Sequence, residues 1–216
     1  MAPFTRILAT LFVAVTAAIG AGIYFSSRDG AGNAASADGS TPVVRENSHR
    51  LNSVPDSDVT LVEFLDFECE GCRAAYPIVE QLRAEYGTRV NFVARYFPMP
   101  GHVNGERAAR AVEAAAQQGR FEQMYTRMFE TQGQWGEQQA PADDVFTGFA
   151  RDLGLDMAAF EHAYNAPATL ERIREDVADG TALGVQGTPT FFLNGEQLTI
   201  RSYGDLGAAI DKALQQ

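Results

Sequence analysis

Residues 59–72 read VTLVEFLDFECEGC, and this stretch decides the fold that the sequence predicts. Its first nine residues form an apolar run rich in β-branched and aromatic side chains, which is typical of a strand covered on both faces. Cys69 and Cys72 follow at once, separated by Glu70 and Gly71. They are the 2 cysteines of a 216-residue chain, so their close spacing is the feature that the sequence has to explain.

The segments on either side of the cysteines predict an α/β domain. Residues 74–86 carry an apolar stripe at helical spacing, which Pro77 should kink and Gly87 should end. Residues 90–97 predict a second strand, and a crossover helix of this length makes the two strands parallel. Near the end of the chain, residues 190–193 and 197–200 predict two short strands. Asn194 and Gly195 between them are a strong hairpin signal, and residues 203–214 predict a last amphipathic helix.

An all-helical insertion separates these two halves. From residue 104 to about residue 183 the composition changes to Ala, Glu, Gln and Arg at helical spacing. This pattern predicts four or five helices, near residues 106–118, 121–131, 143–153, 157–165 and 169–183. The expected domain therefore spans residues 51–216, with strands and helices in layers and the insertion as a cap.

The residues before the domain predict an exported protein. Residues 7–25 are 19 residues without a charge, close to the length that crosses a bilayer. Arg6 precedes the run, while Arg28 and Asp29 after it cancel, so the positive-inside bias places the domain outside the cytoplasm. We expect residues 1–25 to be an uncleaved single-pass membrane anchor. A signal peptide cleaved after residues 35–37, which would release a secreted protein, is the alternative. Residues 26–50 read as a flexible linker.

The composition bounds the partners of the chain. Its 45% hydrophobic content is enough for a core, and its net charge of −11 argues against nucleic acid or an anionic membrane surface as partner. In an oxidising compartment, a lone Cys-x-x-Cys pair predicts redox chemistry. We expect Cys69, at the start of a helix, to be the exposed and activated thiol, because free N–H groups and the helix dipole stabilise a thiolate there. Cys72, within the first turn, should be the buried resolving thiol.

Two other interpretations of the cysteine pair remain open. A purely structural disulfide would close a loop of only four residues, which stabilises a protein little. A metal site would need two further ligands, and His49, His102 and His162 lie in separate segments without ligand spacing. We therefore expect no metal and no cofactor. Pro189, in the segment Gly187-Thr188-Pro189-Thr190, is either an ordinary proline at the entry of an edge strand or a cis proline in a tight turn.

Taken together, these motifs resemble the thioredoxin superfamily. The resemblance rests on Cys-x-x-Cys at a helix start, on Pro77 eight residues after Cys69, and on the segment GTPTFFLNG at residues 187–195. The helical insertion and the segment GVQGTP at residues 184–189 resemble the DsbA-like thiol:disulfide oxidoreductases in particular. The resemblance implies a thioredoxin-like fold in which Pro189 is cis and faces the cysteines. It also implies that the backbone of Thr188 pairs with an extended substrate segment.

Two acidic residues complete the predicted site. Glu63 shares a strand face with Leu61, Leu65 and Phe67, so it should be buried, and the family carries a buried acid there. A buried carboxyl has a raised pKa and could move a proton to or from the resolving thiol. A structurally paired acid is the alternative. Glu70 and Gly71 stand where the best-known oxidases carry Pro-His, and we expect the Glu70 carboxylate to raise the pKa of Cys69 and weaken the oxidant.

The sequence thus predicts an extracytoplasmic enzyme that exchanges disulfides with exported proteins, as a dithiol oxidase. A reductase or disulfide isomerase would use the same site in the other direction. A redox-inert binding module on the same fold is a further alternative. The expected partners are exported proteins with thiols or disulfides and a membrane or extracytoplasmic protein that restores the redox state of the pair. We expect a monomer.

Overall fold

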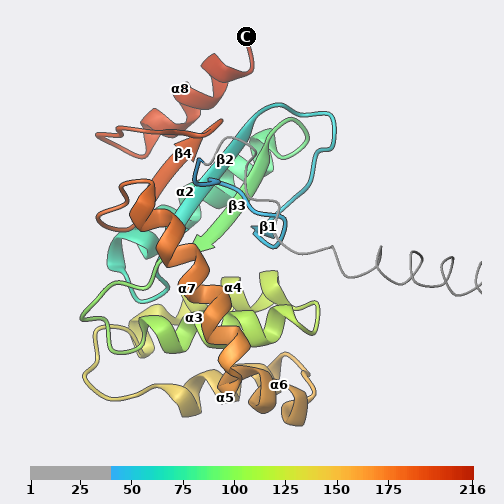
Figure 1. The fold of residues 1–216 in the computed structure, drawn as a ribbon, viewed down its shortest axis with the longest axis vertical. Helices are drawn as coiled ribbons and strands as arrows, with labels where there is room; N and C mark the ends of the chain where they lie inside the picture. The colour runs from blue at the N-terminus through green and yellow to red at the C-terminus, as the bar shows by residue number, and fades with distance from the viewer. Residues whose placement is uncertain (1–39) are drawn as a thin grey trace, which may run out of the picture. The chain divides into compact units, whose positions relative to one another are not determined.

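The apolar run before the cysteines forms the centre of a five-stranded sheet (Figure 1). In the computed structural model, which describes residues 40–216, this run is β2 (Thr60–Leu65). It pairs in parallel with β3 (Asn91–Tyr96) and antiparallel with β4 (Thr190–Leu193). The edges are β1 (His49–Arg50), antiparallel to β3, and β5 (Glu196–Gln197), antiparallel to β4. With a neighbour on each side and helices on both faces, β2 has almost no exposed side chain, which explains its unbroken apolar sequence.

The side chains of β2 alternate between the two faces of the sheet, and helices cover each face. Leu61 and Leu65 belong to the larger core, which they share with α2 (Glu70–Tyr86) and α8 (Gly204–Ala213). Val62 and Phe64 point to the opposite face and form a smaller core with side chains of α7 (Pro167–Ala182). The helix α2 follows β2 directly and returns the chain to the start of β3. The start of α2 therefore lies at the C-terminal end of the central strand β2.

The predicted helical insertion is present as a separate group beside the sheet (Figure 1). It consists of α3 (Gly105–Ala116), α4 (Phe121–Thr131), the short 3-10 helix η1 (Gln132–Gln134), α5 (Asp143–Asp152) and α6 (Met157–Asn165), after which α7 runs back to the sheet. Except for Ala116 at its end, the alanines of α3 are almost fully buried, and α3 contacts α4, α5, α6 and α7. Small side chains let four helices approach this central one.

Most predicted elements are confirmed, and some of them begin or end at residues other than the predicted ones. The ranges 121–131, 157–165 and 190–193 agree with α4, α6 and β4. The helix α2 begins at Glu70 with Cys69 as its N-cap, as predicted for the cysteines, so it includes residues before the apolar stripe at 74–86. The Asn194-Gly195 turn has positive φ at both residues, 52° and 88°, as a tight hairpin requires. The strand predicted at 197–200 is shorter and earlier, at Glu196–Gln197.

The predicted linker, residues 26–50, extends too far toward the domain. The compact unit begins at Thr41, and His49–Arg50 form the edge strand β1. His49 also stacks on Phe121 of α4, with ring centroids 4.0 Å apart, and hydrogen-bonds Glu113 of α3 at 2.6 Å. The segment is ordered although its sequence is polar and irregular, because it contacts residues that are distant in the chain. The predicted anchor at residues 1–25 and the rest of the linker lie outside the described residues. Within residues 40–216, no helix is both long enough and apolar enough to span a bilayer.

Candidate active site

The two cysteines lie at the start of α2 with different exposure. Cys69 is the N-cap residue and is partly exposed, whereas Cys72, in the first turn, is fully buried. Both are free thiols in this structure. Their arrangement agrees with the predicted division into an accessible sulfur and a protected one.

The surroundings of Cys69 favour its thiolate. The pKa of the Cys69 thiol is lowered to about 5, first by a hydrogen bond from the Cys72 thiol and further by the Thr188 side chain and the backbone N–H groups of Cys72 and Gly71, against the opposing effect of burial. None of these amides makes a full capping hydrogen bond with the neutral thiol. Their free N–H dipoles stabilise the charge that appears when the proton leaves.

Thr188 and Pro189 close the site from a distant part of the chain. The Thr188–Pro189 peptide bond is cis, as the resemblance implied. The Cys69 Sγ lies 3.2 Å from the Thr188 carbonyl oxygen, 119 residues away in sequence. A methyl group on Gly71 would lie 3.2 Å from Pro189 Cδ and 3.5 Å from Cys69 Sγ, so the Gly71 backbone fits directly against this proline. The structure therefore brings Cys69, Gly71, Thr188 and Pro189 together.

Glu63 lies in the middle of β2, and its charge acts on Cys72. It is 4% exposed, and burial, reinforced by Cys69 and Glu80, raises its pKa to about 8. Its Oε1 has no hydrogen-bond partner among the described residues. The pKa of Cys72 is raised as well, by burial first and then by its hydrogen bond with Cys69 and the charges of Glu63 and Cys69. Two buried groups that resist ionisation thus lie behind one thiol that ionises readily.

The predicted effect of Glu70 on the pKa of Cys69 is smaller than the effects of the groups in contact with the sulfur. Glu70 is exposed at the first position of α2, and it is absent from the five largest influences on the pKa of Cys69, whose net shift is downward. Water screens an exposed carboxylate, while the Cys72 thiol and the N–H groups that lower the pKa of Cys69 lie beside the sulfur at the start of α2. The hydrogen bond from the Cys72 thiol, together with Thr188 and the N–H groups at the helix start, therefore outweighs the neighbouring charge.

Two residues that the sequence analysis did not single out hold the backbone around the cysteines. The side-chain amide of Gln132, in η1, donates to the carbonyl oxygens of Phe67 at 2.7 Å and Cys69 at 2.9 Å. The hydroxyl of Tyr203, at the N-cap of α8, donates to the Gly71 carbonyl at 2.9 Å. Neither residue belongs to a sequence motif that marks it, since each reaches the site only through the tertiary fold.

Buried acids support the loop that leads into Cys69. Asp66 accepts hydrogen bonds from the Met99 amide at 2.8 Å and from His102 Nδ1 at 2.6 Å. Glu68 accepts one from the Asn104 amide at 2.6 Å. Burial alone would lower the pKa of His102, but its hydrogen bond to Asp66 raises it. These contacts tie the loop to the start of α3. In the described part of the chain, no cluster of His, Cys, Asp and Glu could hold a metal ion.

Comparison with known proteins places this geometry among its relatives. Residues 53–212 match the model of the family described as Thioredoxin. A thioredoxin-like oxidoreductase from Silicibacter pomeroyi DSS-3 is 28% identical, with a TM-score of 0.67 and coverage of 86% of this chain and 99% of that one. The fold is also that of α-DsbA1 from Wolbachia pipientis, at 18% identity and a TM-score of 0.70 over 80% of this chain and 93% of that chain. BdbD from Bacillus subtilis has the same fold, at 20% identity and a TM-score of 0.69 over 78% of this chain and 94% of that chain.

Curated relatives match nearly three quarters of this chain but are much longer. A Na(+)/H(+) antiporter NhaA from Herminiimonas arsenicoxydans is 38% identical over 157 residues, which cover 73% of this chain and 24% of the antiporter. NhaA 1 from Mycobacterium sp. (strain KMS) is 34% identical over 161 residues, 72% of this chain and 25% of the relative. The chain thus spans about a quarter of the length of these relatives.

Proposed function

Since this chain belongs to the thioredoxin family and has a DsbA-like fold, we propose that it catalyses thiol–disulfide exchange with protein substrates through Cys69 and Cys72. The observation that carries this proposal is the opposite perturbation of the two thiols. The pKa of accessible Cys69 is lowered to about 5, while that of buried Cys72 is raised. Activated sites are recognised by such divergent pKa values, because each thiol then has a separate task.

The exchange runs in two steps from the oxidised pair. A substrate thiolate attacks Cys69 Sγ, the Cys69–Cys72 bond breaks, and Cys72 leaves with the electron pair and takes up a proton. A second substrate thiolate then attacks the substrate sulfur of the mixed disulfide, and Cys69 leaves as a stable thiolate. The substrate loses two electrons and gains a disulfide, and the enzyme pair gains both electrons.

Glu63 is suited to supply the proton that Cys72 needs. With a pKa of about 8, its carboxyl group is mostly protonated at neutral pH, and its unpartnered Oε1 is not engaged elsewhere among the described residues. A buried neutral acid can donate to the leaving thiolate and recover the proton when Cys72 attacks in the reverse reaction. Thr188, whose carbonyl lies 3.2 Å from Cys69 Sγ, is positioned to bind the substrate backbone as an added strand.

The low pKa of Cys69 supports an oxidase over a reductase. A disulfide is a stronger oxidant when its reduced form is stabilised, and the Cys69 thiolate is stabilised here. This favours donation of the disulfide to substrates. A reductase or isomerase would use the same residues from the dithiol state, and is the second candidate. A redox-inert scaffold is disfavoured, because it would have no use for an activated Cys69 above a buried acid.

The proposed place of work is outside the cytoplasm, with the domain anchored to the membrane. The uncharged run at residues 7–25, with Arg6 before it, supports this location. Substrates would then be exported proteins with free thiols, and a membrane or extracytoplasmic redox protein would reoxidise the pair. Secretion after signal cleavage is the alternative, and cell fractionation with an antibody against the domain distinguishes the two.

Serine variants of each cysteine test the proposed division of tasks. In Cys72→Ser, the resolving thiol is absent, so we expect mixed disulfides between Cys69 and cellular proteins to accumulate on non-reducing gels. In Cys69→Ser, we expect neither mixed disulfides nor exchange with a reduced model protein. Trapping by acid and alkylation in living cells reports the direction: a mostly oxidised pair supports the oxidase, and a mostly reduced pair supports the reductase. Adducts formed through Cys72 in the Cys69→Ser variant would contradict the assignment.

A further inference from the structure

The hydroxyl of Tyr203 contacts the backbone between the two cysteines. It donates to the Gly71 carbonyl oxygen at 2.9 Å, although the two residues are 132 positions apart. Tyr203 is the N-cap residue of α8 and is partly buried, whereas Gly71 lies in the first turn of α2. This contact joins the C-terminal helix to the turn that carries the reactive sulfur.

One peptide group connects this hydroxyl to the sulfur. The Gly71 carbonyl and the Cys72 N–H belong to the same planar trans peptide, so they point in opposite directions. When Tyr203 holds the carbonyl on one side, the N–H is fixed on the other. The Cys72 N–H acts on the Cys69 sulfur, so the sulfur lies on that side of the peptide. N–H groups in the first turn of a helix have no intrahelical acceptor and are free to face it.

A hydrogen bond to the carbonyl also strengthens the N–H as a donor. Hydrogen bonds in a chain polarise one another, so a peptide that accepts at its oxygen donates better at its nitrogen. The backbone N–H of Cys72 is one of the groups that lower the pKa of Cys69. The Tyr203 hydroxyl remains a donor at working pH, because burial, and then the nearby Cys72, Glu63 and Cys69, raise its pKa.

We infer that Tyr203 is a positioning residue for Cys69: its hydroxyl fixes and polarises the Gly71–Cys72 peptide, whose N–H stabilises the Cys69 thiolate. This inference rests on the proposed function, in which Cys69 is the nucleophile and the leaving group. The C-terminal helix then does more than cover the sheet. It contributes to the redox character of the pair through one hydrogen bond.

The chain offers a matched control for this hydrogen bond. Tyr86, at the end of α2, donates its hydroxyl to Asp211 of α8 at 2.9 Å. Tyr203 and Tyr86 therefore both bridge α2 to the α8 region through a tyrosine hydroxyl, but only Tyr203 reaches the cysteine turn. Tyr203→Phe and Tyr86→Phe each remove one oxygen atom. A general loosening of α8 would appear in both variants, and an effect through the peptide would appear only in Tyr203→Phe.

The test measures the pKa of Cys69 in the full-length reduced protein. The rate of iodoacetamide alkylation and the thiolate absorbance near 240 nm are followed from pH 3 to pH 9. We expect Tyr203→Phe to raise the pKa of Cys69, so that its thiolate fraction at pH 5 falls roughly twofold or more, and its reduction potential against glutathione to fall. Tyr86→Phe should leave both unchanged. The carbonyl carbon resonance of Gly71 should move in Tyr203→Phe alone.

Two results would overturn the inference. One is a pKa of Cys69 that does not change in Tyr203→Phe while the Gly71 resonance shows that the hydrogen bond is lost. The other is an equal change in both tyrosine variants. Because the titration needs only the thiol, it is independent of catalysis: a wild-type protein that fails to exchange disulfides contradicts the proposed function and leaves the titration valid.

Discussion

Burial of Glu63 lowers the stability of the folded protein at neutral pH. The carboxyl is 4% exposed in the centre of β2, with one oxygen unpartnered among the described residues. Its folded-state pKa, about 8, is well above the ordinary value of 4.5. A carboxyl group whose pKa is raised by folding stabilises the folded state fully below pH 4.5, and this stabilisation is lost as the pH rises through about 8. The acid therefore destabilises the protein at neutral pH.

Replacing Glu63 with glutamine tests this cost directly. Glutamine does not titrate, so we expect the free energy of unfolding of Glu63→Gln, relative to wild type, to increase by about 3 kcal/mol between pH 5 and pH 8. Urea unfolding of both reduced proteins at the two pH values measures the difference. Exchange should also slow in the variant, since the proton donor for Cys72 is missing. Equal pH dependence of the two proteins would show that Glu63 ionises in the fold as easily as in the unfolded chain.

At the scale of elements, η1 links the helical insertion to the cysteine loop. Gln132 is 2% exposed, and its amide binds the Phe67 and Cys69 carbonyls. The Cys69 carbonyl also accepts the Arg73 N–H of α2 at 3.1 Å. Removal of the amide therefore affects the Phe67 carbonyl most. Through this side chain, a three-residue helix of the insertion holds the loop that ends β2.

Gln132→Met keeps an unbranched side chain of similar length and removes both hydrogen bonds. We expect it to lower the free energy of unfolding by about 1–3 kcal/mol, because a buried carbonyl loses its donor. Gln134, in the same element, is exposed, so Gln134→Met should change stability by less than about 0.5 kcal/mol. Chemical unfolding of both variants at pH 7 checks the comparison. Similar losses in the two variants would mean that the amide contacts do not stabilise the loop.

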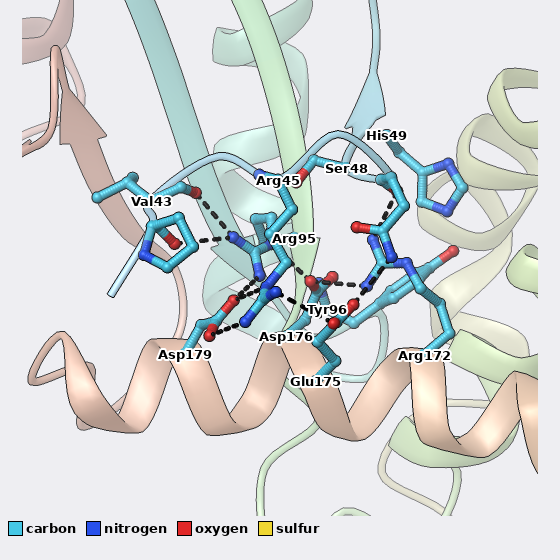
Figure 2. Close-up of polar contacts among 12 residues, drawn as sticks. Val43, Arg45, Ser48, His49, Arg95, Tyr96, Arg172, Glu175, Asp176 and Asp179 are labelled. Atoms are coloured by element: carbon cyan, nitrogen blue, oxygen red, sulfur yellow. Dashed lines mark hydrogen bonds and ion pairs between the residues drawn. The ribbon is translucent and has the colours of Figure 1, made fainter. Parts of the chain in front are cut away.

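At the scale of the whole domain, a buried ionic network holds the segment at residues 41–50 against the sheet and α7 (Figure 2). Arg95 of β3 is fully buried and binds Asp176 and Asp179 of α7, each at 2.6 Å. It also donates to the Val43 carbonyl at 2.8 Å. From the segment itself, Arg45 reaches the second carboxylate, Asp179, through Nη2 at 2.8 Å. This network orders residues that the sequence alone assigned to a linker.

Breaking the network at its centre should be costly. Arg95→Met removes the cation that the two carboxylates share, while Asp176 keeps Arg172 at 2.7 Å and Asp179 keeps Arg45. We therefore expect a loss of about 3 kcal/mol in the free energy of unfolding, at the low end for a broken buried ion pair. Arg107 and Asp143, whose side chains are 39% and 35% exposed, form the control pair. Arg107→Met should cost less than about 1 kcal/mol, because water screens an exposed ion pair. Urea unfolding measures both, and limited proteolysis should cut residues 41–50 faster in Arg95→Met alone. A small loss in Arg95→Met would refute the role given to the network.

The sequence by itself determined what depends on neighbours in the chain. The unbroken apolar run of β2, the helical spacing of the insertion and the Asn194-Gly195 turn each follow from local conformational preference and side-chain periodicity, and each is found in the structure. The pairing of Cys69 with Cys72 at a helix start belongs to the same class. These features could be predicted because their physical causes lie within a few residues.

Only the tertiary structure decided what surrounds the sulfur. Thr188, Tyr203 and Gln132 reach the cysteine turn from 119, 132 and 63 residues away, and β1 forms because His49 and Arg50 meet β3. The pKa of Cys69 is lowered first by the Cys72 thiol and also by the N–H groups at the helix start, as the sequence predicted, whereas the contribution of Thr188 depends on the fold, and the exposed Glu70 is not among the largest influences. A charge exposed to water acts weakly, while a dipole held at short range acts strongly, and only the folded chain fixes which of the two faces the thiol.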